Sequence, residues 1–457
     1  MTGDGGSGSE GALDQALGRR VAVWGLGAEG VALAALAVAR GVEPLLVDDR
    51  PGEAAERVAD AVGVRLAVVA PGDVDWSAVD VVVRSPGVSR YRPELAAAEA
   101  AGTAVTTTMA LWLEDHADAP VVAVTGTKGK STTASLTAAI LEADGRRVEL
   151  IGNIGVPVLD TYGGPRPDAY VVEVSSYQAV DVTRSPAVVV LTSLAPDHLD
   201  WHGGVEQYYR DKLRLVEAGP PGRLAVSAGN EEALSRTSGH PDRTLYGPEG
   251  RVHVDDGGWL VVDGARLADT ARLRVAGRHN VWNLCGAVAG VLLLTGEAPS
   301  AAAVESAMAG FGGLPSRCAV VGERAGRVYV DDALASNPFA SAASIGTFDG
   351  RPLTVIVGGA DRGVDPGPLV EALAAHRPPA SVVVLPPEPG RLAGALAGVA
   401  GQVREASDLA DAVAVATELT PEGGVVLFSP GAPTPEGGGG YGERSRVFVT
   451  AAGLGHG

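Results

Sequence analysis

The chain has 457 residues, enough for about three domains of ordinary size. It carries 36 lysines and arginines against 55 aspartates and glutamates, and this net charge of −19 argues against a nucleic-acid or anionic-membrane binder, because phosphate groups would repel it. With 46% hydrophobic residues and only two cysteines, the composition excludes global disorder, a disulfide scaffold and a cysteine-built zinc site, and it fits a reducing compartment.

The beginning of the chain is rich in glycine and acidic residues, so residues 1–18 are predicted to be a disordered tail. The same stretch lacks the basic and apolar segments of a secretion signal. No apolar run approaches the ~18 residues that span a bilayer. We therefore expect a cytoplasmic protein without membrane insertion and without a nucleic-acid partner.

Beyond the tail, apolar strand patterns alternate with helical patterns, which predicts three α/β domains. Residues 19–116 are predicted to form a Rossmann-like domain, residues 117–314 a central ATP-binding domain with a parallel sheet, and residues 315–457 a second Rossmann-like domain. The expected strands lie at 20–25, 45–49, 79–84, 121–125, 169–174, 187–192, 328–330, 353–357, 381–385 and 425–428, with shorter strands between 223 and 275 and helices at 26–40 and 280–294.

The first glycine-rich loop is the segment 25–30, which follows a strand and fits G-x-G-x-x-G, with Asp48 at the end of the next strand. Gly27 and Gly30 would let the backbone approach a diphosphate. The pattern does not say what is attached to that diphosphate. Close packing of the strand against the helix is the alternative reason for these glycines.

The second loop, Gly126-Thr127-Lys128-Gly129-Lys130-Ser131-Thr132, lies between a buried strand and a helix. Such a loop turns backbone N–H groups toward a phosphate, and the helix N-terminus adds a positive dipole end. Lys130 would reach the β and γ phosphates, and the Ser131 hydroxyl would hold Mg²⁺. Only two residues separate the glycines, where the usual motif has four. An ordinary glycine turn is the alternative, but Lys-Ser-Thr after a buried strand favours nucleotide binding.

Several polar residues follow predicted strands of the central domain. Glu173 ends a strand, where open α/β sheets bind ligands, and a carboxylate suits Mg²⁺. His198 also follows a strand, with Lys212 beyond it, but a lone histidine or lysine is more often a packed or surface residue. Asn280 and Asn283 share one helix face and could meet a purine edge, or Asn280 could simply cap the helix.

Taken in order, the motifs resemble the Mur ligase family: GTKGKST, NIG at 153–155, VEVSSYQ, DHLDWHG, GRHNVWN, GLPSR and GGADRG. The combination is most similar to the MurD type, which adds glutamate during peptidoglycan precursor synthesis and thereby supports cell shape and division. The resemblance runs from about residue 20 to residue 448.

The resemblance implies residue roles throughout the chain. Its implied contacts to UDP-N-acetylmuramoyl-L-alanine are Gly27, Gly30, Asp48, Asp49, Arg50, Ser85, Gly87 and Asn153. Its implied ATP contacts are the loop residues Gly126, Thr127, Lys128, Gly129, Lys130, Ser131 and Thr132, with Asn280, Asn283, Arg317 and Asp332. Its implied ligands for two Mg²⁺ ions are Ser131, Glu173, His198 and a carbamylated Lys212. Its implied catalytic residues are Lys130, His198, Lys212 and Arg317.

The implied chemistry begins with attack of the alanine carboxylate on the γ-phosphoryl of ATP, which gives an acyl phosphate. The neutral amine of glutamate then attacks the acyl phosphate, and inorganic phosphate leaves. An ammonium group would repel Mg²⁺, whereas a carbamate turns a lysine into an oxygen anion; this explains why the family has lysine at the position of Lys212.

The third domain departs from the family pattern around the incoming amino acid. Leu334 stands where a lysine is usual, Ser316 stands where a histidine is usual, and four glycines replace a segment that normally holds aromatics. Arg362, Thr434 and Tyr441 remain as candidate contacts to glutamate.

The third-domain motifs look more similar to a smaller branch that joins L-glutamate and leaves its inversion to a separate epimerase. We expect L-glutamate. D-glutamate is the alternative, because both enantiomers carry identical charges. A non-catalytic nucleotide-binding Mur-like protein is a second alternative. A folylpolyglutamate-type ligase would lack the domain before residue 116, and a NAD-dependent dehydrogenase would leave the second loop without a role.

Overall fold

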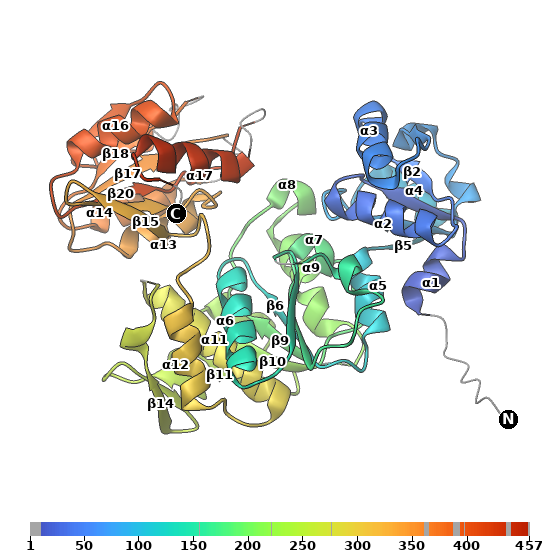
Figure 1. Cartoon of the computed structure of the whole chain (residues 1–457), viewed down its shortest axis with the longest axis horizontal. Coiled ribbons are helices and arrows are strands. Elements are labelled where there is room, and N and C mark those ends of the chain that lie inside the picture. Colours follow the sequence, from blue (N-terminus) through green and yellow to red (C-terminus); the bar gives the residue numbers. More distant parts are fainter. Residues whose placement is uncertain are drawn as a thin grey trace. The chain divides into compact units, whose positions relative to one another are not determined.

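The computed structural model describes residues 11–154, 156–220, 222–275, 277–360, 365–386, 394–396, 398–435 and 440–455. The strands form three sheets, which confirms the predicted three-domain α/β fold (Figure 1). The chain groups into two compact units. The first holds the described residues as far as Thr270, together with 282–307, and the second holds 271–281 and the residues from 308 onward. The three domain boundaries stay predictions.

The first sheet is parallel throughout and has the order β3-β2-β1-β4-β5, a doubly wound arrangement in which ligands bind at the carboxyl ends of the strands. Its strands are β1 (Val21–Trp24), β2 (Leu45–Val47), β3 (Val68–Val69), β4 (Val81–Arg84) and β5 (Ala104–Thr106). Its helices are α2 (Ala28–Ala39), α3 (Pro51–Val62), α4 (Pro93–Ala100) and α5 (Thr108–Asp115), with the 3-10 turns η1 (Pro71–Asp73) and η2 (Trp76–Ala78).

The predicted disordered tail over residues 1–18 is wrong for its last part, because Ala12–Leu17 forms helix α1. Leu13, Ala16 and Leu17 are buried in the core of the first domain. Their i, i+3, i+4 spacing is that of an apolar helix face, a signal that the neighbouring glycines and acids outweighed. Residues 1–10 lie outside the described part of the chain.

The central sheet has the order β14-β13-β12-β11-β10-β9-β6-β8-β7. The strands from β7 to β12 are parallel, as predicted, while β13 and β14 add an antiparallel edge. The strands are β6 (Val121–Thr125), β7 (Val148–Gly152), β8 (Ala169–Glu173), β9 (Val188–Leu191), β10 (Arg223–Ser227), β11 (Arg243–Tyr246), β12 (Val252–Val254), β13 (Trp259–Val262) and β14 (Ala265–Asp269).

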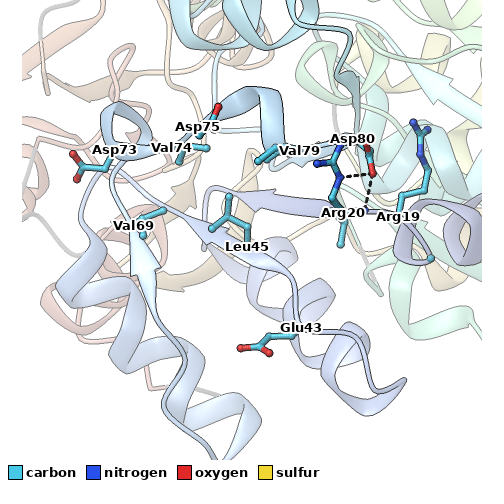
Figure 2. Close-up of a pocket in the computed structure, with 13 residues that line it drawn as sticks. Arg19, Arg20, Glu43, Leu45, Val69, Asp73, Val74, Asp75, Val79 and Asp80 are labelled. Carbon is cyan, nitrogen blue, oxygen red and sulfur yellow. Dashed lines mark hydrogen bonds and ion pairs between the residues drawn. The ribbon is translucent and has the colours of Figure 1, made fainter.

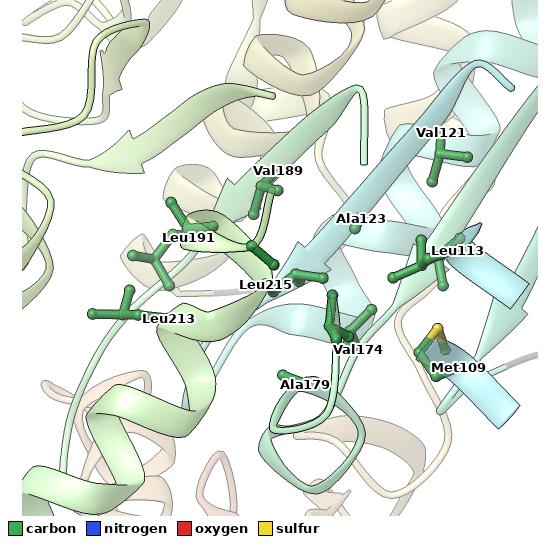
Figure 3. Close-up of a cluster of buried hydrophobic side chains, with 14 of the residues drawn as sticks. Met109, Leu113, Val121, Ala123, Val174, Ala179, Val189, Leu191, Leu213 and Leu215 are labelled. Carbon is green, nitrogen blue, oxygen red and sulfur yellow. The ribbon is translucent and has the colours of Figure 1, made fainter. Parts of the chain in front are cut away.

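Helices cover the central sheet, and apolar side chains from α5, β6, β9 and α9 meet in one core (Figure 3). Every residue of β6 is buried, which explains its mostly apolar sequence and holds its carboxyl end rigidly in place. The helices are α6 (Lys130–Ala143), α7 (Ser176–Ala179), α8 (Leu199–His202), α9 (Val205–Glu217), α10 (Glu231–Arg236), α11 (Arg278–Thr295) and α12 (Ala301–Gly310), with the 3-10 turns η3 (Val158–Thr161) and η4 (Thr270–Arg272).

The third sheet has the order β15-β16-β20-β17-β18-β19, with an apolar core on each face. Only the β15–β16 pair is antiparallel. The strands are β15 (Ala319–Arg324), β16 (Arg327–Asp331), β17 (Leu353–Val357), β18 (Ser381–Val384), β19 (Val403–Glu405) and β20 (Val425–Phe428). The helices are α13 (Pro338–Gly346), α14 (Gly367–Ala375), α16 (Leu409–Leu419) and α17 (Gly440–Ala451).

A buried ion pair joins the first domain to the central domain inside the first unit. Arg84, the last residue of β4, has a fully buried side chain whose guanidinium lies 2.7 Å from the carboxylate of Asp181. It also donates to the carbonyls of Val88 (3.0 Å) and Tyr177 (2.9 Å). Arg90 contacts the second oxygen of Asp181 at 2.8 Å. Because these groups lie away from water, each depends on its partner.

We predict that Arg84→Met lowers the free energy of unfolding of the first unit by roughly 3 kcal/mol, because Asp181 and two carbonyls would lose a donor inside the protein. Arg20→Met is the matched control: Arg20 pairs with Asp80 at the surface, where water replaces a lost partner, so little change is expected. Urea unfolding of both variants checks this, and equal losses would contradict it.

Candidate active site

Three neighbouring strands of the central sheet end at one edge, and each leads into a predicted site segment. β6 runs into the phosphate loop, β8 ends at Glu173, and β9 leads toward His198. Helix α9 brings in Lys212, whose Nζ donates to the carbonyl of Gly126 at 3.0 Å. The structure thus brings these four predicted segments together at the carboxyl edge, where open α/β sheets bind ligands.

The phosphate loop has a backbone that requires its two glycines. Gly126 has φ 144° and Gly129 has φ 87°, and both values disfavour a side chain. A Cβ on Gly126 would overlap Thr192, and one on Gly129 would overlap the amide of Asn283. Helix α6 begins directly after Gly129, so the N–H groups of its first turn lie at the loop. The shortened glycine spacing therefore still gives the anion-binding geometry of a helix N-terminus.

Hydrogen bonds within the loop and from segments outside it hold its shape. The Lys130 ammonium folds back to the carbonyls of Gly126 (3.0 Å) and Thr127 (3.1 Å). The hydroxyl of Thr127 lies 2.8 Å from that of Tyr208 on α9, and its N–H donates to the carbonyl of Ser193 at 2.8 Å. Neither Tyr208 nor Ser193 belongs to a sequence motif, so only the fold identifies them.

Two predicted metal ligands have buried oxygens that find no hydrogen-bond partner within the described part of the chain. These atoms are Ser131 Oγ at the start of α6 and Glu173 Oε2 at the end of β8. The other oxygen of Glu173 accepts from the side-chain amide of Asn153 at 2.7 Å, which orients the carboxylate. Unpartnered buried oxygens cost stability unless another group completes them, and hard oxygens are what Mg²⁺ prefers. The residues therefore fit a magnesium ion.

Lys212 is 2% exposed, and its side chain donates a hydrogen bond to a backbone carbonyl. Burial lowers the pKa of its ammonium well below the usual value, and the nearby charge of Lys130 lowers it further. The amine is thus biased toward its neutral, nucleophilic form. Its ammonium position also lies 5.0 Å from the centre of the Tyr208 ring.

His198 caps α8 with a left-handed backbone conformation, at φ 52°. Burial lowers the pKa of its imidazole to about 4, and the lysines of the phosphate loop contribute to the same shift. The ring is therefore neutral at physiological pH, which is the form that binds a metal. Asp197, its neighbour, lies 3.5 Å from the ammonium of Lys128.

The two predicted adenine contacts both lie on α11, as expected. Asn283 is 9% exposed, and its Oδ1 lies 3.4 Å from the hydroxyl of Thr133 beside the phosphate loop. Asn280 is 8% exposed and is grouped with the second compact unit, whereas Asn283 is grouped with the first. Thr132 lies in the first turn of α6 and is half-buried.

In the first glycine loop, the glycines differ in what requires them. A Cβ on Gly30 would overlap the carbonyl of Gly25 and lie 2.9 Å from Ser85 Oγ, so close packing of the helix on the strand accounts for this glycine. A Cβ on Gly27 would meet nothing within 4 Å, and its φ of −75° suits any residue. The packing alternative therefore explains Gly30 and leaves Gly27 open for a ligand. The Ser85 hydroxyl donates to the Gly25 carbonyl.

The acidic residues after β2 are partly engaged with the protein itself. Asp48 accepts from the N–H of Leu26 at 2.7 Å and from that of Arg50 at 2.9 Å, which ties the glycine loop to the end of β2. Asp49 is exposed and accepts two hydrogen bonds from Arg92 (2.8 and 2.7 Å). The remaining predicted substrate contacts, Arg50 and Gly87, are exposed.

A shallow hollow of about 810 Å³ in the first domain lies elsewhere (Figure 2). It includes Val21 and Leu45, the first residues of β1 and β2, and the surface ion pair of Arg20 with Asp80. It therefore opens at the amino ends of these strands, whereas the predicted ligand loop lies at their carboxyl ends. We place the candidate site at the carboxyl ends, because the free N–H groups at the start of α2 lie there.

The predicted residues of the third domain lie in the second unit. The carboxylate of Asp332 is buried and accepts from Ser344 (2.6 Å), Ser429 (2.7 Å) and the N–H of Cys318 (3.0 Å). Burial raises its pKa to about 6. Arg317 and Thr434 are half-buried, and Tyr441 is 50% exposed at the start of α17. Arg362 lies outside the described residues.

Family models of Mur ligase domains match most of the chain. The MurD-like N-terminal domain matches residues 19–107, the Mur ligase middle domain matches 124–291, and the glutamate ligase domain matches 316–431. The chain belongs to the Mur ligase family. It is accordingly an ATP-dependent ligase that forms an amide bond, with the MurD-type domain set.

Relatives align along nearly the whole of this Mur ligase. The chain is 42% identical to the UDP-N-acetylmuramoyl-L-alanine–L-glutamate ligase of Micromonospora sp., over 96% of this chain and 97% of the relative. It is 38% identical to the ligase of the same name from Xanthomonas axonopodis pv. citri, with 97% of each chain covered.

Solved structures share its fold. MurC from Thermotoga maritima, a UDP-N-acetylmuramate–alanine ligase, matches with a TM-score of 0.60 at 19% identity, over 94% of this chain and 98% of that one. A folylpolyglutamate synthase from Mycobacterium tuberculosis matches with a TM-score of 0.59 at 20% identity. The match includes 93% of the synthase but 75% of this chain, so a quarter of this Mur ligase has no counterpart there. Among the described residues, no helix is long and apolar enough to cross a membrane.

Gly27 and Gly30 of the first loop give a direct test of what each one does. We predict that Gly30→Ala lowers the free energy of unfolding by about 1–3 kcal/mol, because a methyl group would be forced against the carbonyl of Gly25. Gly27→Ala, with open space around its Cβ, should leave stability nearly unchanged and instead weaken binding of a uridine-diphosphate ligand. Urea unfolding and calorimetric titration separate the two effects. Equal stability losses would contradict the assignment.

Proposed function

We propose that this Mur ligase joins L-glutamate to the alanine carboxylate of UDP-N-acetylmuramoyl-L-alanine, with conversion of ATP to ADP and phosphate. The observation that carries the ligase chemistry is the meeting of the phosphate loop, two unpartnered buried oxygens and a buried lysine at the end of β6. The names of relatives at 42% and 38% identity support the glutamate and its L configuration.

The proposal includes two Mg²⁺ ions. Among the described residues, no three histidine, cysteine or acidic side chains come together as a ready-made metal site. Ser131 and Glu173 would hold one ion with the ATP phosphates as further ligands, and His198 and Lys212 would hold the other. Bound there, Mg²⁺ would offset negative charge on the phosphoryl oxygens.

Lys212 is proposed to be carbamylated. Carbon dioxide reacts with a neutral amine, and the lowered pKa of this buried lysine favours that form. The amine nitrogen adds to the carbon of CO₂ and loses a proton, which leaves an oxygen anion at the end of the side chain. A cation beside Lys130 is thereby replaced by an anion that suits a metal.

The proposed reaction has two steps. An oxygen of the alanine carboxylate attacks the γ-phosphorus of ATP, and the bond to the bridging oxygen of ADP breaks; Lys130 and Arg317 offset the charge on the phosphoryl oxygens. The neutral amine of glutamate then attacks the carbonyl carbon of the acyl phosphate. Phosphate leaves, and the amine gives up its proton as the amide forms.

The remaining roles follow the domains. The loop at Gly27 and the residues after β2 and β4 are proposed to bind the uridine diphosphate, and Asn153 the muramoyl part. Asn280 and Asn283 are proposed to bind adenine, and Asp332 is a further proposed ATP contact. Thr434, Tyr441 and Arg362 are proposed contacts to glutamate, and a separate epimerase would then act on the product. We also propose that the protein works in the cytoplasm, where nucleotide-linked substrates are made.

Lys212→Ala is predicted to abolish phosphate release, because the carbamate oxygen would be lost, and added formate or acetate should restore a part of it. Lys128→Ala is the control, since a neighbouring loop lysine without a carbamate should gain nothing from added carboxylates. Undiminished activity of Lys212→Ala would refute the role.

Steady-state phosphate release with each glutamate enantiomer tests the proposed amino acid. We predict a clear preference for L-glutamate, with release dependent on UDP-N-acetylmuramoyl-L-alanine as well. A preference for D-glutamate would overturn the configuration and keep the ligase. Absence of release with either enantiomer would favour a non-catalytic nucleotide-binding protein, an alternative raised by the departures at Ser316 and Leu334.

A further inference from the structure

The three proposed metal-ligand segments around β8 and β9 come from separate parts of the chain. Glu173 ends β8, His198 caps α8, and Lys212 lies on α9. A metal site needs its ligands held to within a fraction of an ångström, and hydrogen bonds behind the ligands usually provide this. The structure contains a buried set of side chains that links the same three segments.

His202 is at the centre of this set. It ends the short helix α8 that begins next to His198, and its side chain is completely buried. Its Nδ1 lies 2.6 Å from Asp211 Oδ2, and its Nε2 lies 3.0 Å from Ser176 Oγ. A ring nitrogen this close to a carboxylate carries the proton, so Nδ1 donates to Asp211 and Nε2 accepts from the Ser176 hydroxyl.

Each end of this set is next to a proposed ligand segment. Asp211 immediately precedes Lys212 on α9, and Ser176 begins α7, three residues after Glu173. One imidazole therefore bridges α7, α8 and α9. The arrangement has the residue types of a hydrolase triad, but Ser176 is 3% exposed, so a substrate carbonyl has no access to its hydroxyl.

The first domain completes the set. The hydroxyl of Tyr91, which lies beyond β4, is 2.7 and 2.8 Å from the two oxygens of Asp211. Gln207, one turn before Asp211 on α9, donates to the same carboxylate at 2.8 Å. Asp211 therefore accepts from three side chains, which fixes its rotamer and the turn of α9 that carries Lys212.

We propose that Ser176, His202 and Asp211 form a positioning unit that sets the spacing of Glu173, His198 and Lys212 and thereby the affinity for divalent metal. The inference rests on the proposed roles of those three residues as metal ligands. None of the three members of the unit is a metal ligand in this proposal; each acts by holding a segment in place.

The test uses Mn²⁺, followed by electron paramagnetic resonance, as the probe of the full chain in bicarbonate buffer without nucleotide. His202→Leu removes both ring hydrogen bonds and should weaken Mn²⁺ binding about 10–100-fold. His202→Asn keeps a donor where Nδ1 stood and should recover a substantial part of that loss. Unchanged affinity in a folded His202→Leu variant would overturn the proposal.

His376→Leu is the matched control. His376 is 2% exposed, and its ring nitrogens lie 2.8 Å from the carbonyl of Pro378 and 3.1 Å from that of Phe348. This variant loses the same kind of buried contacts in the second unit, which contains none of the proposed metal ligands. Its Mn²⁺ affinity should be unchanged, and a loss equal to that of His202→Leu would reduce the effect to general destabilisation and refute the proposal.

Milder variants keep the test decisive should His202→Leu not fold. Ser176→Ala and Tyr91→Phe each remove one hydroxyl, and each should weaken Mn²⁺ binding a few-fold; unchanged affinity in both would refute the proposal. Glu173→Gln separates the two levels of inference. No effect of Glu173→Gln would refute the proposed ligand set, whereas an effect there with none at His202 would refute the positioning unit alone.

Discussion

The structure depends on one constraint: polar groups are buried at the end of β6, and some of them lack a hydrogen-bond partner among the described residues. Ser131 Oγ and Glu173 Oε2 have no hydrogen bond, and Lys212 is buried against a carbonyl and a tyrosine ring. Each arrangement lowers stability on its own. The surrounding apolar core, built from β6, β9, α5 and α9, outweighs that cost and keeps these groups from turning toward water. The groups proposed to bind metal are therefore buried polar groups that lack a full set of hydrogen-bond partners in the described part of the protein.

The glycines show how the same residue serves two purposes. Gly126, Gly129 and Gly30 are demanded by the fold, because a Cβ at each would overlap a neighbouring atom. Gly27 is free of such contacts, so its small size leaves room for something other than the protein. A sequence pattern such as G-x-G-x-x-G merges these cases, and only the space around each Cβ separates them.

Much of the fold could be predicted from the sequence, since β6, β17 and β20 are mostly apolar runs with turn residues at both ends. The places of the phosphate loop and Glu173 at the carboxyl ends of β6 and β8 could be predicted, because each follows an apolar strand pattern in the sequence, while their roles stay predictions. Helix α1 was missed because six residues are a weak signal beside a glycine-rich stretch. Asp211 and Tyr208 could not be predicted, because their partners are distant in the sequence and only tertiary packing brings them together.

Hydrogen bonds from the first domain reach the reactive edge at two places. Glu29, inside the first glycine loop, accepts from the side chain of Gln178 at 3.0 Å, and Gln178 in turn accepts from the N–H of Ser175, two residues after Glu173. Tyr91 reaches Asp211 beside Lys212 in the same way. Both links would break if the first domain moved away from the central one. The first domain is thus part of the scaffold behind the proposed metal ligands, and its position affects how the carboxyl edge of the central sheet is held.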